Sequence, residues 1–146
     1  MEKRLNIMES QPMAAKAMYG LEAYLSTTQL SKSQKELIKI RASQINGCAF
    51  CIDMHTKDAL LNGETNQRIF LLNAWKETAL FTEEEKAILA ITEEVTLIHQ
   101  KGLTDDTYKK AEEIFGASYL SEIIMAVVTI NAWNRIAISA QLDVPR

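Results

Sequence analysis

Hydrophobic and polar positions follow the period of amphipathic helices along most of this chain. Ile88, Ile91, Val95 and Ile98, for example, recur three or four residues apart, which places them on one face of a helix. One apolar run, IIMAVVTI, is rich in β-branched residues, but no second strand candidate exists to pair with it. We therefore predict an all-α chain with about seven helices. Their ranges are 12–27, 31–45, 48–62, 64–75, 82–102, 104–116 and 119–140.

Local signals mark several of the predicted helix ends. Ser31 with Gln34, and Thr82 with Glu85, have the spacing of capping boxes, in which side chain and backbone bond reciprocally at a helix start. Gly47 is placed to end the second helix in a left-handed conformation. The third helix therefore begins close to residue 48.

The last predicted helix differs from the others because it is apolar on nearly every side. Only Glu122 and Arg135 carry charge between residues 119 and 140, so we expect a central or interface helix. A helix this apolar is hard to cover within 146 residues, which favours a homo-oligomer. Its amides, Asn131 and Asn134, must be paired if they are buried, and we expect a structural polar network or a subunit contact.

Composition narrows the class of protein. With 146 residues, 47% hydrophobic and 24% charged, the sequence predicts one globular domain over residues 1–146. With sixteen basic residues against 19 acidic ones, the chain lacks the excess of positive charge that is typical of nucleic-acid-binding proteins. The start, MEKRLNIMES, has no apolar core of a signal peptide. The charge-free stretch 123–134 is short of the roughly 20 residues of a membrane span, so we expect a cytoplasmic protein that does not bind a membrane.

The chemistry of this sequence is concentrated around two cysteines. Cys48 and Cys51 are the only cysteines, and they are too close in sequence to staple the fold. With His55 they share one helix face, near a helix N-terminus that would stabilise a thiolate. We interpret them as a dithiol that cycles to a disulfide, with His55 exchanging a proton with Cys51.

Other interpretations of these residues stay open. The two cysteines and His55 could be three zinc ligands with a carboxylate as the fourth, or the cysteines could be inert buried side chains. Glu36 either forms a surface ion pair with Lys32 or Lys39, or turns inward against His55 or a thiol. Asp58, one turn after His55, could orient the imidazole, although such an aspartate is more often solvated. Four methionines are interpreted as core residues, Met13, Met18, Met54 and Met125.

The stretch ELIKIRASQINGCAFCIDMHTKDA, supported by the later NAWNRIAI, resembles the alkylhydroperoxidase D-like branch of the carboxymuconolactone decarboxylase family. The resemblance covers nearly the whole chain. It implies an all-helical homo-oligomer, commonly a trimer or hexamer, that reduces hydroperoxides. It also implies roles for four residues: Cys51 as the thiol oxidised to sulfenic acid, Cys48 as the proton donor and resolving thiol, and Glu36 with His55 as the proton relay.

On two points the residues of this chain differ from what the resemblance implies. The helix N-terminus by itself favours Cys48 as the nucleophile, whereas the family assigns that role to Cys51. The best-studied family pattern also has a histidine between the cysteines, where this chain has Phe50. We expect a cytoplasmic peroxidase that needs no haem, flavin or metal and is regenerated by an external dithiol, lipoyl- or thioredoxin-like. A lyase or isomerase acting on a lactone or keto acid, and a zinc-binding structural module, are the alternatives.

Overall fold

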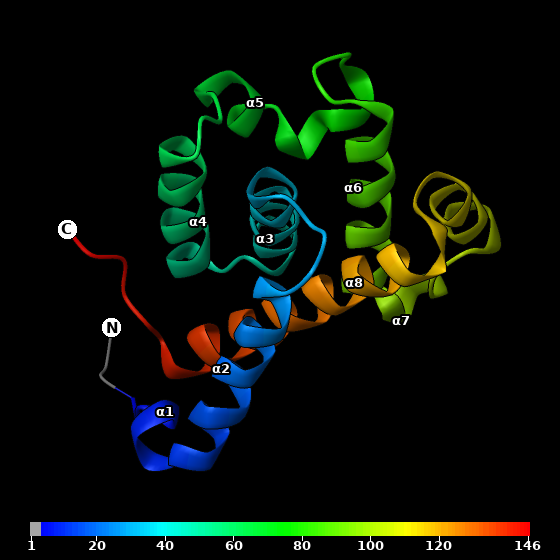
Figure 1. Cartoon of the computed structure of the whole chain (residues 1–146). Coiled ribbons are helices and arrows are strands. Elements are labelled where there is room, and N and C mark those ends of the chain that lie inside the picture. Colours follow the sequence, from blue (N-terminus) through cyan, green and yellow to red (C-terminus); the bar gives the residue numbers. More distant parts are fainter. Residues whose placement is uncertain (1–3) are drawn as a thin grey trace.

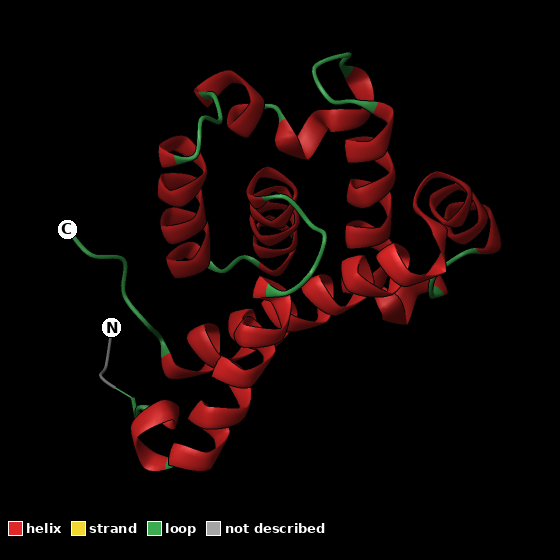
Figure 2. Cartoon of the chain, in the orientation of Figure 1, coloured by secondary structure: helices red, strands yellow, loops and turns green. Residues whose placement is uncertain are grey.

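The computed structural model describes residues 4–146, and its regular structure is entirely helical (Figure 2). No strand occurs in this part of the chain, so the predicted fold class is confirmed. The elements are α1 (Ile7–Ser10), α2 (Pro12–Ser26), α3 (Lys32–Asn46), α4 (Ala49–Leu61), α5 (Asn66–Phe70), the 3-10 helix η1 (Leu72–Glu77), α6 (Glu83–Thr96), α7 (Ile98–Lys101) and α8 (Asp105–Ala140).

Helix α3 lies at the centre of the fold and is surrounded by the others (Figure 1). It packs between α4 and α6 and rests on α8. Its side chains Leu37, Ile38 and Ile40 are fully buried. Ile38 belongs to the apolar core shared with α6 and α8, whereas Leu37 and Ile40 belong to the core under α5 and η1. Burial on both sides fixes the orientation of α3, and with it the direction in which its polar residues point.

The predicted helix ends are confirmed where local chemistry determines them. Ser31 and Gln34 form a capping box at the start of α3, and Thr82 and Glu85 form another at the start of α6. Gly47 ends α3 with φ +70° and ψ 33°, in the left-handed region that glycine adopts without strain.

Two predicted helices are wrong in their extent. The range 64–75 is divided into α5 and η1, because the tighter 3-10 turn brings Leu72 and Trp75 to the same buried side. The range 82–102 is divided at Leu97, and the Glu94 carboxylate there accepts a hydrogen bond from the Thr104 backbone N–H at 2.8 Å. That bond draws the following segment back against α6. The short helix α1 is not predicted at all.

The long helix α8 combines two predicted helices, 104–116 and 119–140, which meet at the non-helical Gly116. Among residues 4–146 it is the one helix long and apolar enough to cross a membrane by length and composition. The 12-residue charge-free stretch 123–134, from which we judged the chain too short of apolar residues for a membrane span, therefore understates the length and apolar character of this helix. It packs against α2, α3, α4 and α6.

Candidate redox site

The two cysteines lie at the junction of α3 and α4. Gly47 turns the chain, Cys48 caps the N-terminus of α4, and Cys51 lies in its first turn. The two sulfur atoms form a disulfide between Cα atoms 5.3 Å apart, and the Cys48 Sγ accepts a hydrogen bond from the Cys51 backbone N–H at 3.4 Å. Both side chains are buried. The predicted pairing of the thiols is therefore present, in its oxidised form.

His55 and Glu36 form a buried pair behind the disulfide. His55 lies one helix turn after Cys51, and its Nδ1 is 3.1 Å from Oε2 of Glu36 on α3. The other carboxylate oxygen of Glu36 is 3.7 Å from Nζ of Lys39. Both interpretations of Glu36 thus hold in part, because it turns inward to His55 and also pairs with Lys39. Glu36 and His55 are each 8% exposed, so the contact lies in a low-dielectric setting.

A cavity of about 350 Å³ opens beside Cys51 and His55. We call it the redox pocket. Most of its wall is apolar or aromatic, and its polar wall residues are largely engaged: the Trp133 Nε1–H donates to Glu22 at 3.0 Å, and Lys39 pairs with Glu36. The rest of the wall is Met8, Tyr19, Phe50, Met54, Ile136, Ala137 and Leu142.

Sequence reasoning missed most of these wall residues. They come from α1, α2, α8 and the segment after α8, which are far from the cysteines along the chain. Met54 is not a core residue, because it is 40% exposed and lies on this wall. Met13, also interpreted as a core residue, is 75% exposed. The position of Met54 between Cys51 and His55 in the sequence is the signal that could have placed it on the pocket wall.

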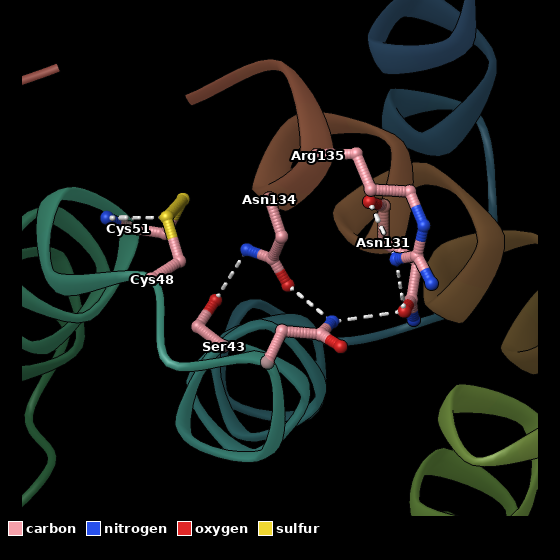
Figure 3. Close-up of a disulfide and its surroundings, with 7 residues drawn as sticks. Ser43, Cys48, Cys51, Asn131, Asn134 and Arg135 are labelled. Carbon is pink, nitrogen blue, oxygen red and sulfur yellow. Dashed lines mark hydrogen bonds between the residues drawn. A yellow bond between two sulfur atoms is a disulfide. The ribbon is translucent and has the colours of Figure 1, made fainter. Parts of the chain in front are cut away.

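A chain of hydrogen-bonded amides, of which Asn134 is buried and Asn46 and Asn131 are partly buried, links α8 to the turn that carries Cys48 (Figure 3). Asn134 Nδ2 donates to Ser43 Oγ at 2.9 Å, and its Oδ1 accepts from Asn46 Nδ2 at 2.9 Å. Asn46 Nδ2 also donates to Asn131 Oδ1. The expected structural network is therefore confirmed. Because the Ser43 carbonyl accepts the Cys48 backbone N–H at 3.0 Å, the network also holds the turn before α4 in position.

The zinc interpretation, with Cys48 and Cys51 as ligands, applies only to the reduced protein. Sulfur atoms joined in a disulfide are not thiolate ligands. Within the described residues, one group of three possible ligands occurs, Glu36, His55 and Asp58, whose ligand atoms lie within 4.8 Å of one another. Asp58 is exposed, whereas the other two are buried.

Comparisons with known proteins found a matching family model, a relative of known sequence and similar solved structures. The model of the carboxymuconolactone decarboxylase family matches residues 12–94. The chain is 42% identical over 139 residues, 95% of both chains, to the uncharacterised protein YdfG of Bacillus subtilis (strain 168). It is 38% identical to a solved protein of unknown function from Agrobacterium tumefaciens, whose name suggests an antioxidant defence protein AhpD. That match covers 99% of both chains, with a TM-score of 0.94.

A more distant structure shares the fold alone. The debrominase Bmp8 is 17% identical, with a TM-score of 0.83 over 94% of this chain and 74% of its own.

Proposed function

We propose, because this chain belongs to the carboxymuconolactone decarboxylase family, that it is a thiol-dependent peroxidase that reduces organic hydroperoxides. The observation that carries the proposal is the Cys48–Cys51 disulfide at the wall of an apolar pocket, with the His55–Glu36 pair behind it. A close pair of cysteines, a substrate-sized cavity and a buried proton carrier are the three parts that such a reaction needs.

The first half of the cycle consumes the hydroperoxide. In the reduced protein, His55 accepts the Cys51 thiol proton, and the thiolate attacks the distal oxygen of the substrate. The O–O bond breaks, Cys51 becomes a sulfenic acid, and the leaving alkoxide takes the proton from His55 to become an alcohol. Glu36 stabilises the imidazolium between these two transfers, since its carboxylate is 3.1 Å from Nδ1.

The second half closes the disulfide and then reopens it. The Cys48 sulfur attacks the Cys51 sulfenic acid, and the hydroxyl leaves with the Cys48 proton as water. An external dithiol, such as a lipoyl- or thioredoxin-like protein, then reduces the disulfide and becomes oxidised itself. We propose a cytoplasmic location, because a reducing compartment keeps such a dithiol available.

The pocket supports Cys51 as the attacking thiol. Cys51 lies on the pocket wall, whereas Cys48 does not. This access outweighs the position of Cys48 at the helix N-terminus, because a substrate must reach the sulfur before its charge matters. Phe50, where the family pattern has a histidine, also lies on this wall and adds apolar surface. The proposed substrate is therefore an apolar organic hydroperoxide rather than hydrogen peroxide.

The test is a thiol titration of the reduced protein before and after one equivalent of cumene hydroperoxide. We expect two thiols to be lost per chain and to be recovered with a dithiol. We expect Cys48→Ser to accumulate a sulfenic acid that dimedone traps, and Cys51→Ser to stay unreacted. Unchanged thiols in the reduced wild-type protein would refute the proposal. Trapping in Cys51→Ser instead would reverse the two cysteine roles.

A lyase of the kind that names the family is the rival function. A Cys48→Ser, Cys51→Ser double variant would keep full lyase activity, because that chemistry needs no dithiol. Stoichiometric zinc in freshly purified protein would instead support a structural metal module.

We also propose a homo-oligomer, trimeric or hexameric as the resemblance implies. Helix α8 exposes Val128 and Ile138, at 42% and 44%, and a second copy would cover such side chains. Light scattering coupled to size exclusion that gives a monomer at micromolar concentration would exclude this assembly.

A further inference from the structure

Among the described residues, Lys39 is the only lysine or arginine on the wall of the redox pocket. Its side chain is 17% exposed, so most of it is removed from bulk water. Its ion-pair partner is Glu36, whose Oε1 lies 3.7 Å from Nζ, farther than a hydrogen bond reaches. In the described part of the chain this ammonium donates no hydrogen bond. Because an ammonium has three N–H donors, Lys39 keeps the capacity to bind an anion besides Glu36.

The rest of the pocket favours an apolar ligand about the size of one aromatic ring with its substituents. A volume of about 350 Å³ is near the lower end of the range for small-ligand sites. The rings of Tyr19 and Trp133 lie 6.0 Å apart at an angle of 52°, and Phe50 and Met54 are on the same wall. Such side chains pack well against an aromatic ring or a short alkyl chain. A ligand with this body and one anionic group would use both the apolar wall and Lys39.

The other charges near Lys39 restrict where an anionic group can lie. Glu36 on α3 is shared between Lys39 and His55. Glu22 on α2 is also on the pocket wall, and its Oε1 accepts the hydrogen bond from Trp133 at 3.0 Å. No ion pair joins Glu22 to Lys39 within residues 4–146, so the two charges occupy separate parts of the wall. An anion is attracted at Lys39 and repelled at Glu22, which favours one orientation of the ligand.

We infer that the substrate of the redox pocket is an apolar hydroperoxide that carries a carboxylate, and that Lys39 binds this carboxylate. The inference rests on the proposed function. Lys39 contacts Glu36, Glu36 contacts His55, and Cys51 lies one helix turn, about 6 Å of rise, before His55. A carboxylate at Lys39 therefore leaves the opposite end of the substrate, with its O–O bond, toward Cys51. The flexible four-carbon stem lets the ammonium turn to the carboxylate while the stem covers the wall.

The first test measures binding to the full chain in its disulfide form, by isothermal titration calorimetry. The two probes are para-isopropylbenzoate and the neutral para-isopropylbenzamide, which have the same apolar body. We expect the carboxylate to bind about tenfold more tightly than the amide, the size of one charge-assisted hydrogen bond. Lys39→Met keeps the apolar stem and removes the charge, so it should abolish this preference and leave the affinity for the amide unchanged. Lys39→Arg should retain most of the preference.

The matched control is Lys35→Met, one turn earlier on α3 and not on the wall of the redox pocket. It should keep the full preference for the carboxylate. Equal affinities of the wild-type chain for the two probes, or no detectable binding of the carboxylate, would overturn the inference. So would a preference that survives Lys39→Met, or one that Lys35→Met abolishes as completely.

A second measurement connects this binding to the reaction. Cumene hydroperoxide with a carboxylate in the para position should oxidise the reduced wild-type chain about tenfold faster than cumene hydroperoxide itself, at concentrations below saturation. In Lys39→Met the two rates should be equal. Equal rates in the wild-type chain would overturn the assignment of Lys39 and leave the peroxidase proposal standing. The binding probes contain no peroxide, so selective carboxylate binding by a chain that neither hydroperoxide oxidises would refute the peroxidase proposal alone.

Discussion

Replacing Asn134 by leucine tests how strongly the amide network around this buried residue supports the turn that carries Cys48. Asn134 is fully buried, and its amide bonds to Ser43 Oγ and Asn46 Nδ2, each at 2.9 Å. Leucine removes both bonds. Asn46 keeps its bond to Asn131, but the buried Ser43 oxygen loses the side-chain donor that reaches it. One such orphaned group costs about 1–3 kcal/mol, and two lost hydrogen bonds bring the total to about 2–4 kcal/mol.

The assay is equilibrium unfolding in urea at pH 7 on the disulfide form. Thr129→Val is the matched control, because Thr129 is buried on the same helix but its hydroxyl donates only to Met125 one turn earlier. We expect it to cost less than about 1 kcal/mol. Adding Ser43→Ala to Asn134→Leu should recover about 1 kcal/mol or more, since both polar partners are then gone. A loss below about 0.5 kcal/mol in Asn134→Leu, or no recovery in the double variant, would refute this account of the network.

Two further predictions concern acid stability and the pocket. Burial raises the pKa of Glu93, but hydrogen bonds from Trp75, Lys76 and Arg41 outweigh it and hold that pKa below its ordinary value. Its contribution to stability is therefore complete above the ordinary glutamate pKa, about 4.3, and is lost as the pH falls through the lower folded value. Urea unfolding of Glu93→Gln should show a flatter acid limb between pH 5 and 3, and an unchanged limb would contradict this. Trp133→Ala opens the redox pocket and removes the donor to Glu22, so KM for cumene hydroperoxide should rise several-fold while the rate with hydrogen peroxide changes little. Equal losses with both oxidants would indicate a damaged fold.

Local chemistry explains which parts of the molecule could be predicted. A capping box such as Ser31 with Gln34, and a left-handed residue such as Gly47, are decided by a few neighbouring residues and are read correctly from the sequence. The proximity of Cys48 to Cys51 is likewise local, because three residues at a helix start cannot lie far apart. Glu36 is different. The position of Glu36 in the sequence allowed either a surface ion pair with a lysine or an inward contact with His55. The packing of α3 against α4 brings Glu36 to His55.

The remaining features depend on contacts between distant segments. The break between α5 and η1 depends on which side chains the core accepts, and a periodic pattern does not report that. The wall of the redox pocket requires Met8, Trp133 and Leu142 to meet around Cys51. No local signal in the sequence links those positions. A separate cavity of about 310 Å³, lined by Glu36, is hidden for the same reason.

The wall of the redox pocket has an evolutionary consequence. The cysteines, His55 and Glu36 lie within residues 12–94, which the family model matches, whereas Met8, Trp133 and Leu142 lie outside that range. Under the proposed function, substitutions at Met8, Trp133 or Leu142 would therefore reshape what enters the cavity while the proposed reacting groups stay in place. Paralogues with identical cysteine motifs should diverge in substrate preference, and exchanging their terminal segments should transfer that preference between them.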